Sequence, residues 1–378
     1  MRVVLVVGRS TGGIGTHVGQ LAADLRALHH EVCIVTDAAT ARRFGWDDEG
    51  TLTWWPRDCA SAVRWPGRLR RLAAGADVIH AHGIQAGAAV VTVLPGPPRP
   101  RTRVVVSLHN LPPGGGPGGW VGRLLARLAV RRADLATGAS SDLVALALQL
   151  GAREAQLAPV PSPLVPTLLA APVPGAEERA AGVADLGLGD RPLVLTVSRI
   201  APQKRLDVVV AAAGLLRHRS DVLWAVVGDG DAALRATLES QATDVVLLGA
   251  QADVTELLRA ATVLVVSSDW EARALVVQEA MAAGIPVVAT DVGGLRDLLA
   301  GTGVLVPPGA PSLLASALDT LLDDLLGEQS DSDPGDDGRA GSSRGAERAR
   351  AAREVAASWA DGPTTARQWV RWYAATDP

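Results

Sequence analysis

Short apolar runs alternate with amphipathic segments along the first half of the chain. Runs rich in Val or Ile predict strands at residues 3–7, 32–36, 78–80 and 104–108. Residues 17–28 place apolar side chains at the 3.6-residue period of an amphipathic helix, and residues 120–132 form another such segment. Strand–helix–strand alternation of this kind predicts a parallel α/β sheet.

The alternation stops in a Pro-rich stretch at residues 159–174, which predicts a linker between domains. It then resumes, and apolar runs predict further strands at residues 193–198, 223–227, 245–248, 263–266 and 287–289. The pattern therefore predicts two Rossmann-like, doubly wound α/β domains, over residues 1–165 and 186–327.

Three segments fall outside this pattern. Residues 112–119 are almost entirely Pro and Gly and are predicted to form a flexible loop. Residues 328–346 contain almost nothing apolar, which predicts a disordered insertion. Residues 346–375 are predicted to be helical and to dock on another part of the chain, because this segment is rich in aromatic side chains. These are Trp359, Trp369, Trp372 and Tyr373.

The composition supports large buried cores, because 48% of the residues are apolar and 20% are charged. No run of uninterrupted apolar residues is long enough to predict a transmembrane helix. The apolar run at residues 3–7 ends at Gly8 and is interpreted as a strand rather than a signal peptide. Cys33 and Cys59 are too few to indicate a disulfide framework or a metal site, so we expect a cytoplasmic protein.

Charge is divided unevenly between the two halves. Residues 1–165 hold 18 Arg and 11 acidic residues, a net charge of +7, whereas the remainder holds 18 basic and 29 acidic residues, a net of −11. The first domain is therefore expected to favour an anionic partner. Its arginines cluster at Arg64, Arg68, Arg70, Arg71 and on one side of residues 120–132, near Trp65 and Trp120. This pattern predicts contact with an anionic acceptor or a membrane surface, the alternative being a solvated arginine-rich face.

Ligands of open α/β sheets bind where strands end in Gly-rich turns and helix N-termini. The turn at residues 8–17 contains Gly12 and Gly13 but lacks the spacing of a dinucleotide fingerprint, so it remains either a phosphate contact or a plain structural turn. After the strand at 193–198, Arg199 and Lys204 place two cations on one loop, which suits a diphosphate. Lys204 is the only lysine in the chain.

Two further strand ends carry acidic residues. Asp229 and Asp231 have the spacing of a metal-binding Asp-x-Asp, but in such a turn aspartates more often cap the following helix. Residues 267–294 contain Glu271 in a loop and Glu279 in the helix that follows. This arrangement predicts that the Glu271 carboxylate lies at the entrance of a binding site and that the Glu279 carboxylate binds hydroxyl groups. The alternative is that the two carboxylates act as an acid–base pair.

Residues 267–294 resemble the Glu-x7-Glu signature of the retaining family 4 glycosyltransferases almost position for position. The Arg199–Lys204 loop resembles the Arg-x4-Lys diphosphate loop of the same family. Gly12-Gly13 and Leu108-His109-Asn110 are similar to motifs of its N-terminal domain, and the resemblance spans about residues 1–325. It implies the GT-B fold, in which two Rossmann-like domains face each other across a cleft. The first domain would bind the acceptor and the second a nucleotide-sugar donor.

The resemblance also implies roles for individual residues. Arg199 and Lys204 would hold the donor diphosphate and stabilise the leaving group, Glu271 would face the donor sugar, and Glu279 would bind the ribose hydroxyls. The remaining donor-binding positions are Leu275 and Val276. In the first domain, Gly13 would approach the diphosphate through its backbone and His109 would lie beside the transferred sugar. The terminal segment, residues 354–378, would pack back onto the first domain.

The activity implied is retaining transfer of a sugar from a nucleotide diphosphate to an acceptor hydroxyl, without a metal or other cofactor. The expected partners are the donor and an anionic or membrane-associated acceptor, with no nucleic acid. The expected location is the cytoplasm, including the inner face of the membrane. The family usually has Glu-Gly-Phe-Gly where this chain has Glu271-Ala272-Arg273-Ala274. This departure supports an alternative, a degenerate nucleotide-sugar-binding protein, and offers Arg273 as an extra cation for donor or acceptor.

Overall fold

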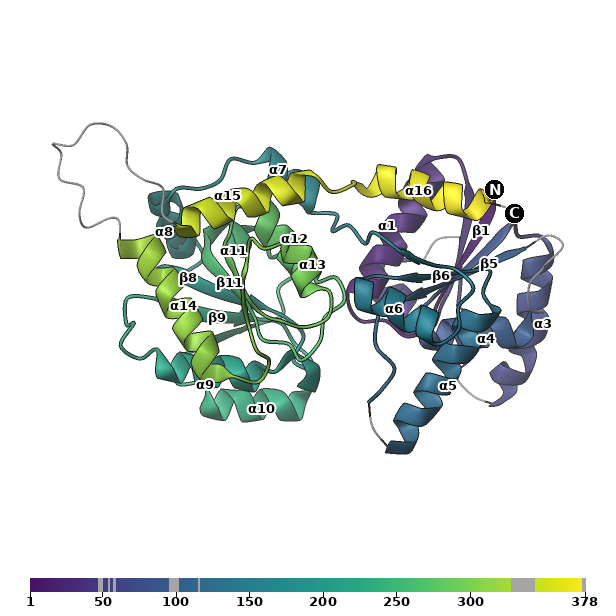
Figure 1. Cartoon of the computed structure of the whole chain (residues 1–378), viewed down its shortest axis with the longest axis horizontal. Helices are drawn as coiled ribbons and strands as arrows, with labels where there is room; N and C mark the ends of the chain where they lie inside the picture. The colour runs from purple at the N-terminus through teal and green to yellow at the C-terminus, as the bar shows by residue number, and fades with distance from the viewer. Residues whose placement is uncertain are drawn as a thin grey trace. The chain divides into compact units, whose positions relative to one another are not determined.

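The computed structural model describes residues 1–46, 50–53, 55–56, 59–94, 102–114, 116–327 and 344–375. The chain divides into two compact units (Figure 1). One unit comprises Met1–Pro163 with Ala360–Pro378, and the other comprises Leu164–Trp359. Within the described residues, no helix has both the length and the apolar character needed to cross a membrane.

The first unit contains a seven-stranded parallel sheet with the order β3-β2-β1-β4-β5-β6-β7. Its strands are β1 (Arg2–Val7), β2 (Glu31–Val35), β3 (Thr51–Leu52), β4 (Val78–His82), β5 (Arg103–Leu108), β6 (Leu135–Gly138) and β7 (Ala155–Leu157). The central strands are buried along almost their whole length. Burial on both faces explains why they form continuous apolar runs instead of alternating apolar and polar residues.

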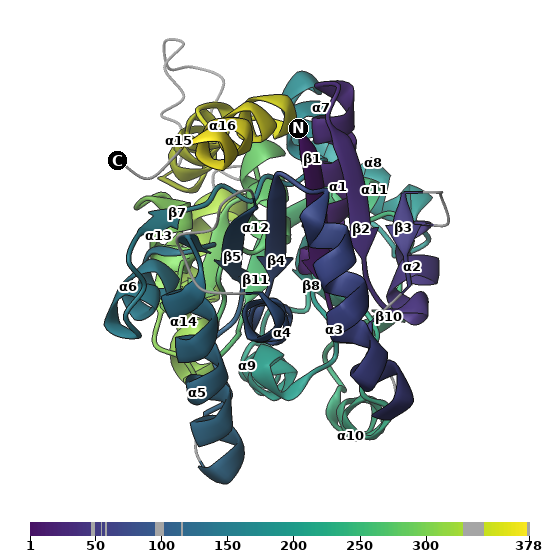
Figure 2. The same ribbon diagram turned by 90° about the vertical axis from the view of Figure 1, so that its right-hand side faces the viewer.

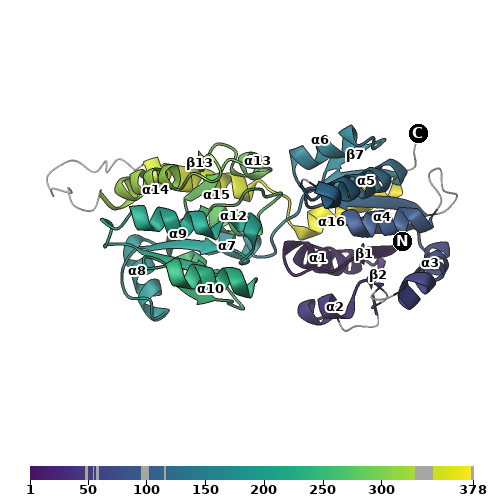
Figure 3. The same ribbon diagram turned by 90° about the horizontal axis from the view of Figure 1, so that it is seen from below.

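Helices pack on both faces of this sheet. α1 (Gly13–Ala27) contacts α2 (Ala38–Phe44) and the C-terminal α16 (Gly362–Ala374), and Figures 1 and 3 show α16 beside α1. Each of the remaining helices contacts the next one along the chain. These helices are α3 (Cys59–Ala74), α4 (Ile84–Val93), α5 (Gly116–Arg132) and α6 (Ser141–Gln149). α16 buries Trp369 and Tyr373 in the core formed by α1 and the strands, so the end of the chain completes the first unit.

The second unit contains a six-stranded parallel sheet with the order β10-β9-β8-β11-β12-β13. Its strands are β8 (Leu193–Val197), β9 (Leu223–Val227), β10 (Val246–Gly249), β11 (Ala261–Val266), β12 (Val287–Thr290) and β13 (Val304–Val306). One core lies between the sheet and helices α9 (Leu206–Leu215), α10 (Ala232–Gln241) and α14 (Pro311–Leu326).

A second core of this unit involves α7 (Val165–Ala170), α8 (Ala176–Asp185), α11 (Thr255–Ala260), α12 (Leu275–Ala282), α13 (Leu295–Leu299) and α15 (Arg344–Ala357). A short 3-10 helix, η1 (Pro202–Lys204), precedes α9. α15 contacts α12 and α14 (Figure 3).

The predicted fold class, two doubly wound α/β units, is confirmed, and several boundaries differ. The loop predicted at 112–119 is wrong over 116–119, which form the first turn of α5. Most of the predicted disordered insertion, 328–343, lies outside the described residues, whereas residues 344–346 begin α15. The linker region 159–174 contains α7.

The segment predicted as one helical stretch, residues 346–375, is two helices. α15 ends at Ala357, and Asp361 caps α16 by accepting a hydrogen bond from Thr364 N at 2.8 Å. Residues 354–359, which we expected to pack with the first domain, belong to the second unit. The Asp361 cap and Pro363 in the first turn of α16 start a new helix, which explains the break.

Candidate active site

The predicted donor residues of the second unit follow the carboxyl ends of neighbouring parallel strands. β8 is followed by the loop that carries Arg199 and Lys204, β11 by the loop that carries Glu271, and β12 by the Gly293-Gly294 turn. Because β8, β11 and β12 are adjacent and parallel, the three loops lie at one edge of the sheet.

Lys204 and Glu271 are in direct contact at this edge. The Lys204 Nζ donates a hydrogen bond to Glu271 Oε1 in an ion pair whose side chains are only 17% and 11% exposed. Ser268 Oγ donates a second hydrogen bond to the same oxygen at 2.6 Å. A carboxylate with so little exposure needs such partners, because burying it unpaired costs several kcal/mol, to order of magnitude.

Hydrogen bonds between the two loops hold this contact in place. Gln203 Nε2 donates to Trp270 O at 2.5 Å, and Asp269 N donates to Gln203 O at 2.8 Å. Ser267 Oγ donates to Lys204 O at 2.8 Å, which ties the end of β11 to the residue that carries the ammonium. Lys204 therefore ends a short 3-10 turn, and hydrogen bonds from the loop after β11 fix the position of this turn.

Glycine is required where the third loop passes beneath Glu271. Gly293 has φ 50°, and a Cβ there would lie 2.0 Å from Glu271 O. Gly294 N donates to the same carbonyl at 2.9 Å. The Gly-Gly turn therefore packs against the Glu271 carbonyl and holds the backbone of Glu271 in position.

The Asp229–Asp231 turn is structural, as the capping interpretation predicted. Asp231 accepts hydrogen bonds from Ala233 N at 2.9 Å and Leu234 N at 3.0 Å and so caps α10. Asp229 pairs with Arg235. Between the aspartates, a Cβ on Gly230 would lie 2.1 Å from Ile200 O, so this glycine lets the turn approach the loop that carries Arg199.

The other predicted donor residues lie on the same loops or on α12. Arg199 is exposed in the loop after β8. Leu275 and Val276 are the first two residues of α12, and Glu279 is buried in its middle. The first turn of α12 has backbone N–H groups without helical acceptors, so this end attracts anions.

The Ala272-Arg273-Ala274 departure is accommodated without backbone strain. Neither alanine is among the non-glycine residues with positive φ, and Ala274 caps α12 at φ −66°. The guanidinium of Arg273, the residue that we considered as an extra cation, lies 5.2 Å from the centre of the Trp359 ring. Burial lowers the pKa of Arg273, and its Nε has no hydrogen-bond partner. This arginine thus packs against the end of the α15 segment.

In the first unit, Gly13 and His109 lie at the carboxyl edge of the sheet. Gly13 is the first residue of α1, and His109 directly follows β5. The rings of His17, on α1, and His109 have their centroids 5.7 Å apart. The structure therefore brings the Gly-rich turn and His109 to one end of the first sheet.

A cluster of buried histidines surrounds His109, and our sequence interpretation missed it. His82 Nδ1 lies 3.1 Å from His109 Nε2, so one nitrogen donates and the other accepts. Burial lowers the pKa of His109 to about 3 and that of His17 to about 4, and it lowers the pKa of His82 well below its usual value. The imidazoles are therefore neutral at pH 7. The signal was the His-Ala-His end of β4, which puts both histidines on one face of the strand.

The first histidine of that pair anchors the C-terminal helix. His80 Nδ1 lies 2.7 Å from the Tyr373 hydroxyl, and His80 Nε2 lies 2.6 Å from Ser107 Oγ. Burial raises the pKa of Tyr373, which keeps the hydroxyl protonated. This link fixes α16 to the strands that carry the cluster.

A cavity of about 370 Å³ lies beside His82 in the first unit. Its polar lining comes from the buried His82 and from Arg9, Gln85 and Asn110, which are exposed. Its apolar lining includes Ile14, Ile84, Val121 and Leu125. The cavity can therefore hold a molecule that has both apolar and polar parts.

Family models match both units. Residues 12–163 match the model described as "Glycosyl transferase 4-like domain", and residues 191–324 match "Glycosyl transferases group 1". The chain is 39% identical over 201 residues to a D-inositol 3-phosphate glycosyltransferase from Kineococcus radiotolerans, covering 46% of this chain and 45% of that protein. It is also 39% identical over 125 residues to a GDP-mannose-dependent alpha-mannosyltransferase from Mycobacterium tuberculosis, covering 32% and 31%. The chain thus spans less than half the length of these curated relatives.

Solved structures share the whole fold. HepE from Anabaena, in complex with UDP-glucose, has a TM-score of 0.79 at 21% identity, covering 98% of this chain and 99% of that one. Sucrose-phosphate synthase from Thermosynechococcus elongatus has a TM-score of 0.75 at 21% identity, covering 98% of each. The predicted GT-B fold is confirmed. With two matching family models and this fold, the chain belongs to the group 1, family 4-like glycosyltransferases.

Proposed function

We propose that this protein is a retaining glycosyltransferase that moves a sugar from a nucleoside diphosphate to an acceptor hydroxyl. The observation that carries the proposal is the Lys204–Glu271 contact at the carboxyl edge of the second sheet, next to the first turn of α12. A cation, a carboxylate and a helix N-terminus together suit a diphosphate attached to a sugar.

In this proposal the cations act on the leaving group. The bond between the anomeric carbon and the diphosphate oxygen breaks, and Arg199 and Lys204 stabilise the charge that develops on that oxygen. An ammonium has three N–H donors, so Lys204 can contact Glu271 and a phosphate oxygen together. The N–H groups of Leu275 and Val276 add to the same phosphate site.

The acceptor hydroxyl then bonds to the anomeric carbon on the face that the diphosphate leaves. Its proton passes to the departing diphosphate, so that no enzyme nucleophile is needed and configuration is retained. Glu271 orients the donor sugar, Glu279 binds the ribose hydroxyls, and Gly13 contacts the diphosphate through its backbone. His109, neutral at pH 7, offers a hydrogen bond to the transferred sugar without adding positive charge. We assign no metal or other cofactor to this reaction.

We place the acceptor in the cavity beside His82. Arg9 supplies a cation there, while the apolar walls suit an amphipathic molecule. The nearby helix α5 exposes Trp120 (69%) and Leu124 (50%), and its first turns extend beyond the neighbouring elements (Figure 2). These features support an anionic, membrane-associated acceptor and peripheral attachment of the protein to the inner membrane face.

The relatives suggest the first donors to test, UDP-glucose and GDP-mannose. The experiment incubates the protein with each donor, follows release of the nucleoside diphosphate, and assigns the anomeric configuration of the product by NMR. Release with retention supports the proposal, and inversion contradicts it. Tight donor binding without turnover, across a panel of donors and acceptors, would favour the degenerate binding protein.

A further inference from the structure

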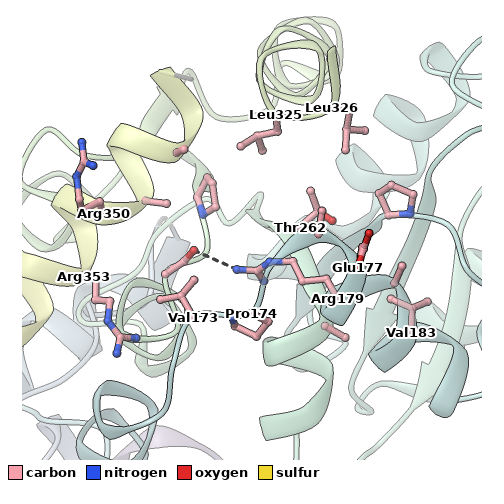
Figure 4. Close-up of a pocket in the computed structure, with 18 residues that line it drawn as sticks. Val173, Pro174, Glu177, Arg179, Val183, Thr262, Leu325, Leu326, Arg350 and Arg353 are labelled. Carbon is pink, nitrogen blue, oxygen red and sulfur yellow. Dashed lines mark hydrogen bonds between the residues drawn. The ribbon is translucent and has the colours of Figure 1, made fainter. Parts of the chain in front are cut away.

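The second unit contains a cavity that the proposed reaction does not use. Its volume is about 620 Å³, within the range of about 300–1,000 Å³ typical of small-molecule sites. α8, the end of α14 and α15 surround it (Figure 4). Its walls are mainly apolar and include Val173, Ala180, Val183, Leu325, Leu326 and Pro286.

This cavity lies at the opposite edge of the sheet from the donor loops. Pro192 directly precedes β8, Thr262 is the second residue of β11, and Pro286 directly precedes β12. These lining residues therefore mark the amino ends of the strands, whereas Lys204 and Glu271 follow their carboxyl ends. At about 3.3 Å per residue, strands of this length separate the two sites by roughly 15–20 Å.

Two arginines from different helices line the cavity, and among the described residues their guanidinium groups donate to neutral acceptors. Arg179, on α8, donates to the carbonyl oxygens of Arg259, Ala261 and Gly284. Arg353, on α15, donates to carbonyl oxygens as well, and these belong to Leu168, Leu169, Ala171 and Ala282. Figure 4 shows the two guanidinium groups on separate walls.

Carbonyl oxygens, not carboxylates, hold these two guanidinium groups. Within the part of the chain that the structure describes, neither Arg179 nor Arg353 forms an ion pair. Burial lowers the pKa of Arg179 to about 10, the shift expected when a cation loses water without gaining an anion. Arg350 adds a third, exposed cation, and Glu177 is the one acidic side chain among the described residues of the lining.

We propose that this cavity binds an amphipathic anion, an alkyl chain with a carboxylate or phosphate head. The chain lies against Val183, Leu325 and the apolar stems of the arginines. The head lies near Arg350, where the field of all three cations favours a negative charge. This site is independent of the proposed transfer reaction.

The test measures binding of decanoate to the full chain by calorimetry, below its micelle concentration. We expect saturable binding with one decanoate per chain, at least tenfold weaker binding of decanol, and a rise in melting temperature with decanoate. Decyl phosphate, compared in the same assay, decides which head group the site prefers. Equal affinity for decanol and decanoate, or no saturable binding of decanoate, would overturn the proposal.

Three variants locate the site. Arg350→Glu reverses the exposed cation and should weaken decanoate binding at least tenfold, whereas the matched change Arg348→Glu, also exposed on α15 but not in the lining, should leave it unchanged. Ala176→Trp, at an exposed position of α8 that lines the cavity, should block binding without disturbing the core. Undiminished binding to both Arg350→Glu and Ala176→Trp would place decanoate elsewhere and refute the assignment.

Discussion

The Lys204 ammonium donates a hydrogen bond to the Glu271 carboxylate, joining two loops whose residues are 67 positions apart in the chain. The contact couples the two residues most central to the proposed chemistry. Either one can therefore affect function by its own charge or by leaving its partner unpaired, and variants at this pair must separate the two effects.

Substitution of Lys204 by alanine should lower turnover by roughly two to three orders of magnitude, the scale expected when one preorganised charge on a leaving group is lost. Lys204→Arg should recover only part of the activity, because a planar guanidinium cannot replace a compact ammonium between Glu271 and a phosphate. Steady-state kinetics with the preferred donor would check both variants.

The control for Lys204→Ala is its stability. Glu271 retains the Ser268 hydrogen bond, so we expect a loss of about 1–3 kcal/mol in unfolding free energy, without loss of the fold. Arg217→Ala, which removes an exposed ion pair with Asp244, should change neither turnover nor stability by much. Near-normal turnover in Lys204→Ala would remove the whole Arg199–Lys204 loop from the mechanism.

His82 should act as a positioning residue for His109. His82→Phe keeps a ring in the cluster but removes the 3.1 Å contact, so we expect turnover to fall about tenfold while the KM for the donor stays within a factor of about two. His82→Asn can return a polar group to the contact and should recover part of the loss. A fall in donor affinity with unchanged turnover would contradict this role.

Arg273 should contribute to stability rather than to donor binding. Arg273→Ala and Trp359→Ala should each destabilise the second unit, and a double-mutant cycle should give a coupling energy of about 0.5–1 kcal/mol. Arg273→Phe introduces the aromatic side chain of the Glu-Gly-Phe-Gly pattern and removes the unpaired buried Nε. The melting temperature of this variant should therefore not fall. A large rise in the KM for the donor in Arg273→Ala would show that this arginine reaches the substrate.

The sequence predicted those parts of the fold that have strong local signals. β8 and β11 are continuous apolar runs because both of their faces are buried. β6 (Leu-Ala-Thr-Gly) and β7 (Ala-Gln-Leu) were missed, because they are short and β6 has neither Val nor Ile.

For the candidate site, the sequence predicted where residues lie relative to the strands, but not which side chains contact one another. Loop positions such as Lys204 and Glu271 follow from strand ends, but their contact depends on how two distant loops pack. The inward direction of Arg273 depends on Trp359, 86 residues later in the chain, and no local pattern encodes it. Similarly, Trp65 was predicted to share a surface with Trp120, yet it is 4% exposed and belongs to the interior.

Membrane attachment should depend on the exposed side of α5. Trp120→Ser with Leu124→Ser should reduce flotation with anionic liposomes severalfold, because these side chains supply the apolar contact beside Arg123 and Arg127. Leu215→Ser, an equally exposed leucine in the second unit, is the matched control and should not change flotation. Equal partitioning onto neutral and anionic liposomes, insensitive to salt, would rule out this surface.

The histidine cluster should make the first unit sensitive to acid. His17 and His109 have folded-state pKa values of about 4 and about 3, below the 6.5 of an unfolded histidine. As the pH falls below 6.5, the unfolded chain takes up protons that the folded chain does not, so stability is complete above 6.5 and declines toward pH 4. At pH 5, each of these two imidazoles should lower the free energy of unfolding by about 2 kcal/mol relative to its value at pH 7.

Hydrogen exchange localises this effect. Between pH 7 and 5, after correction for the intrinsic rate, protection should fall for peptides covering β4 and β5, which carry or adjoin the buried histidines. Peptides covering β8 and β11 should keep their protection, because the histidine of the second unit, His218, is 59% exposed. Equal losses in both units would mean that acid acts through carboxylates or general charge repulsion and not through the cluster. A loss of protection confined to the first unit would identify its neutral histidines as the groups whose protonation destabilises that unit.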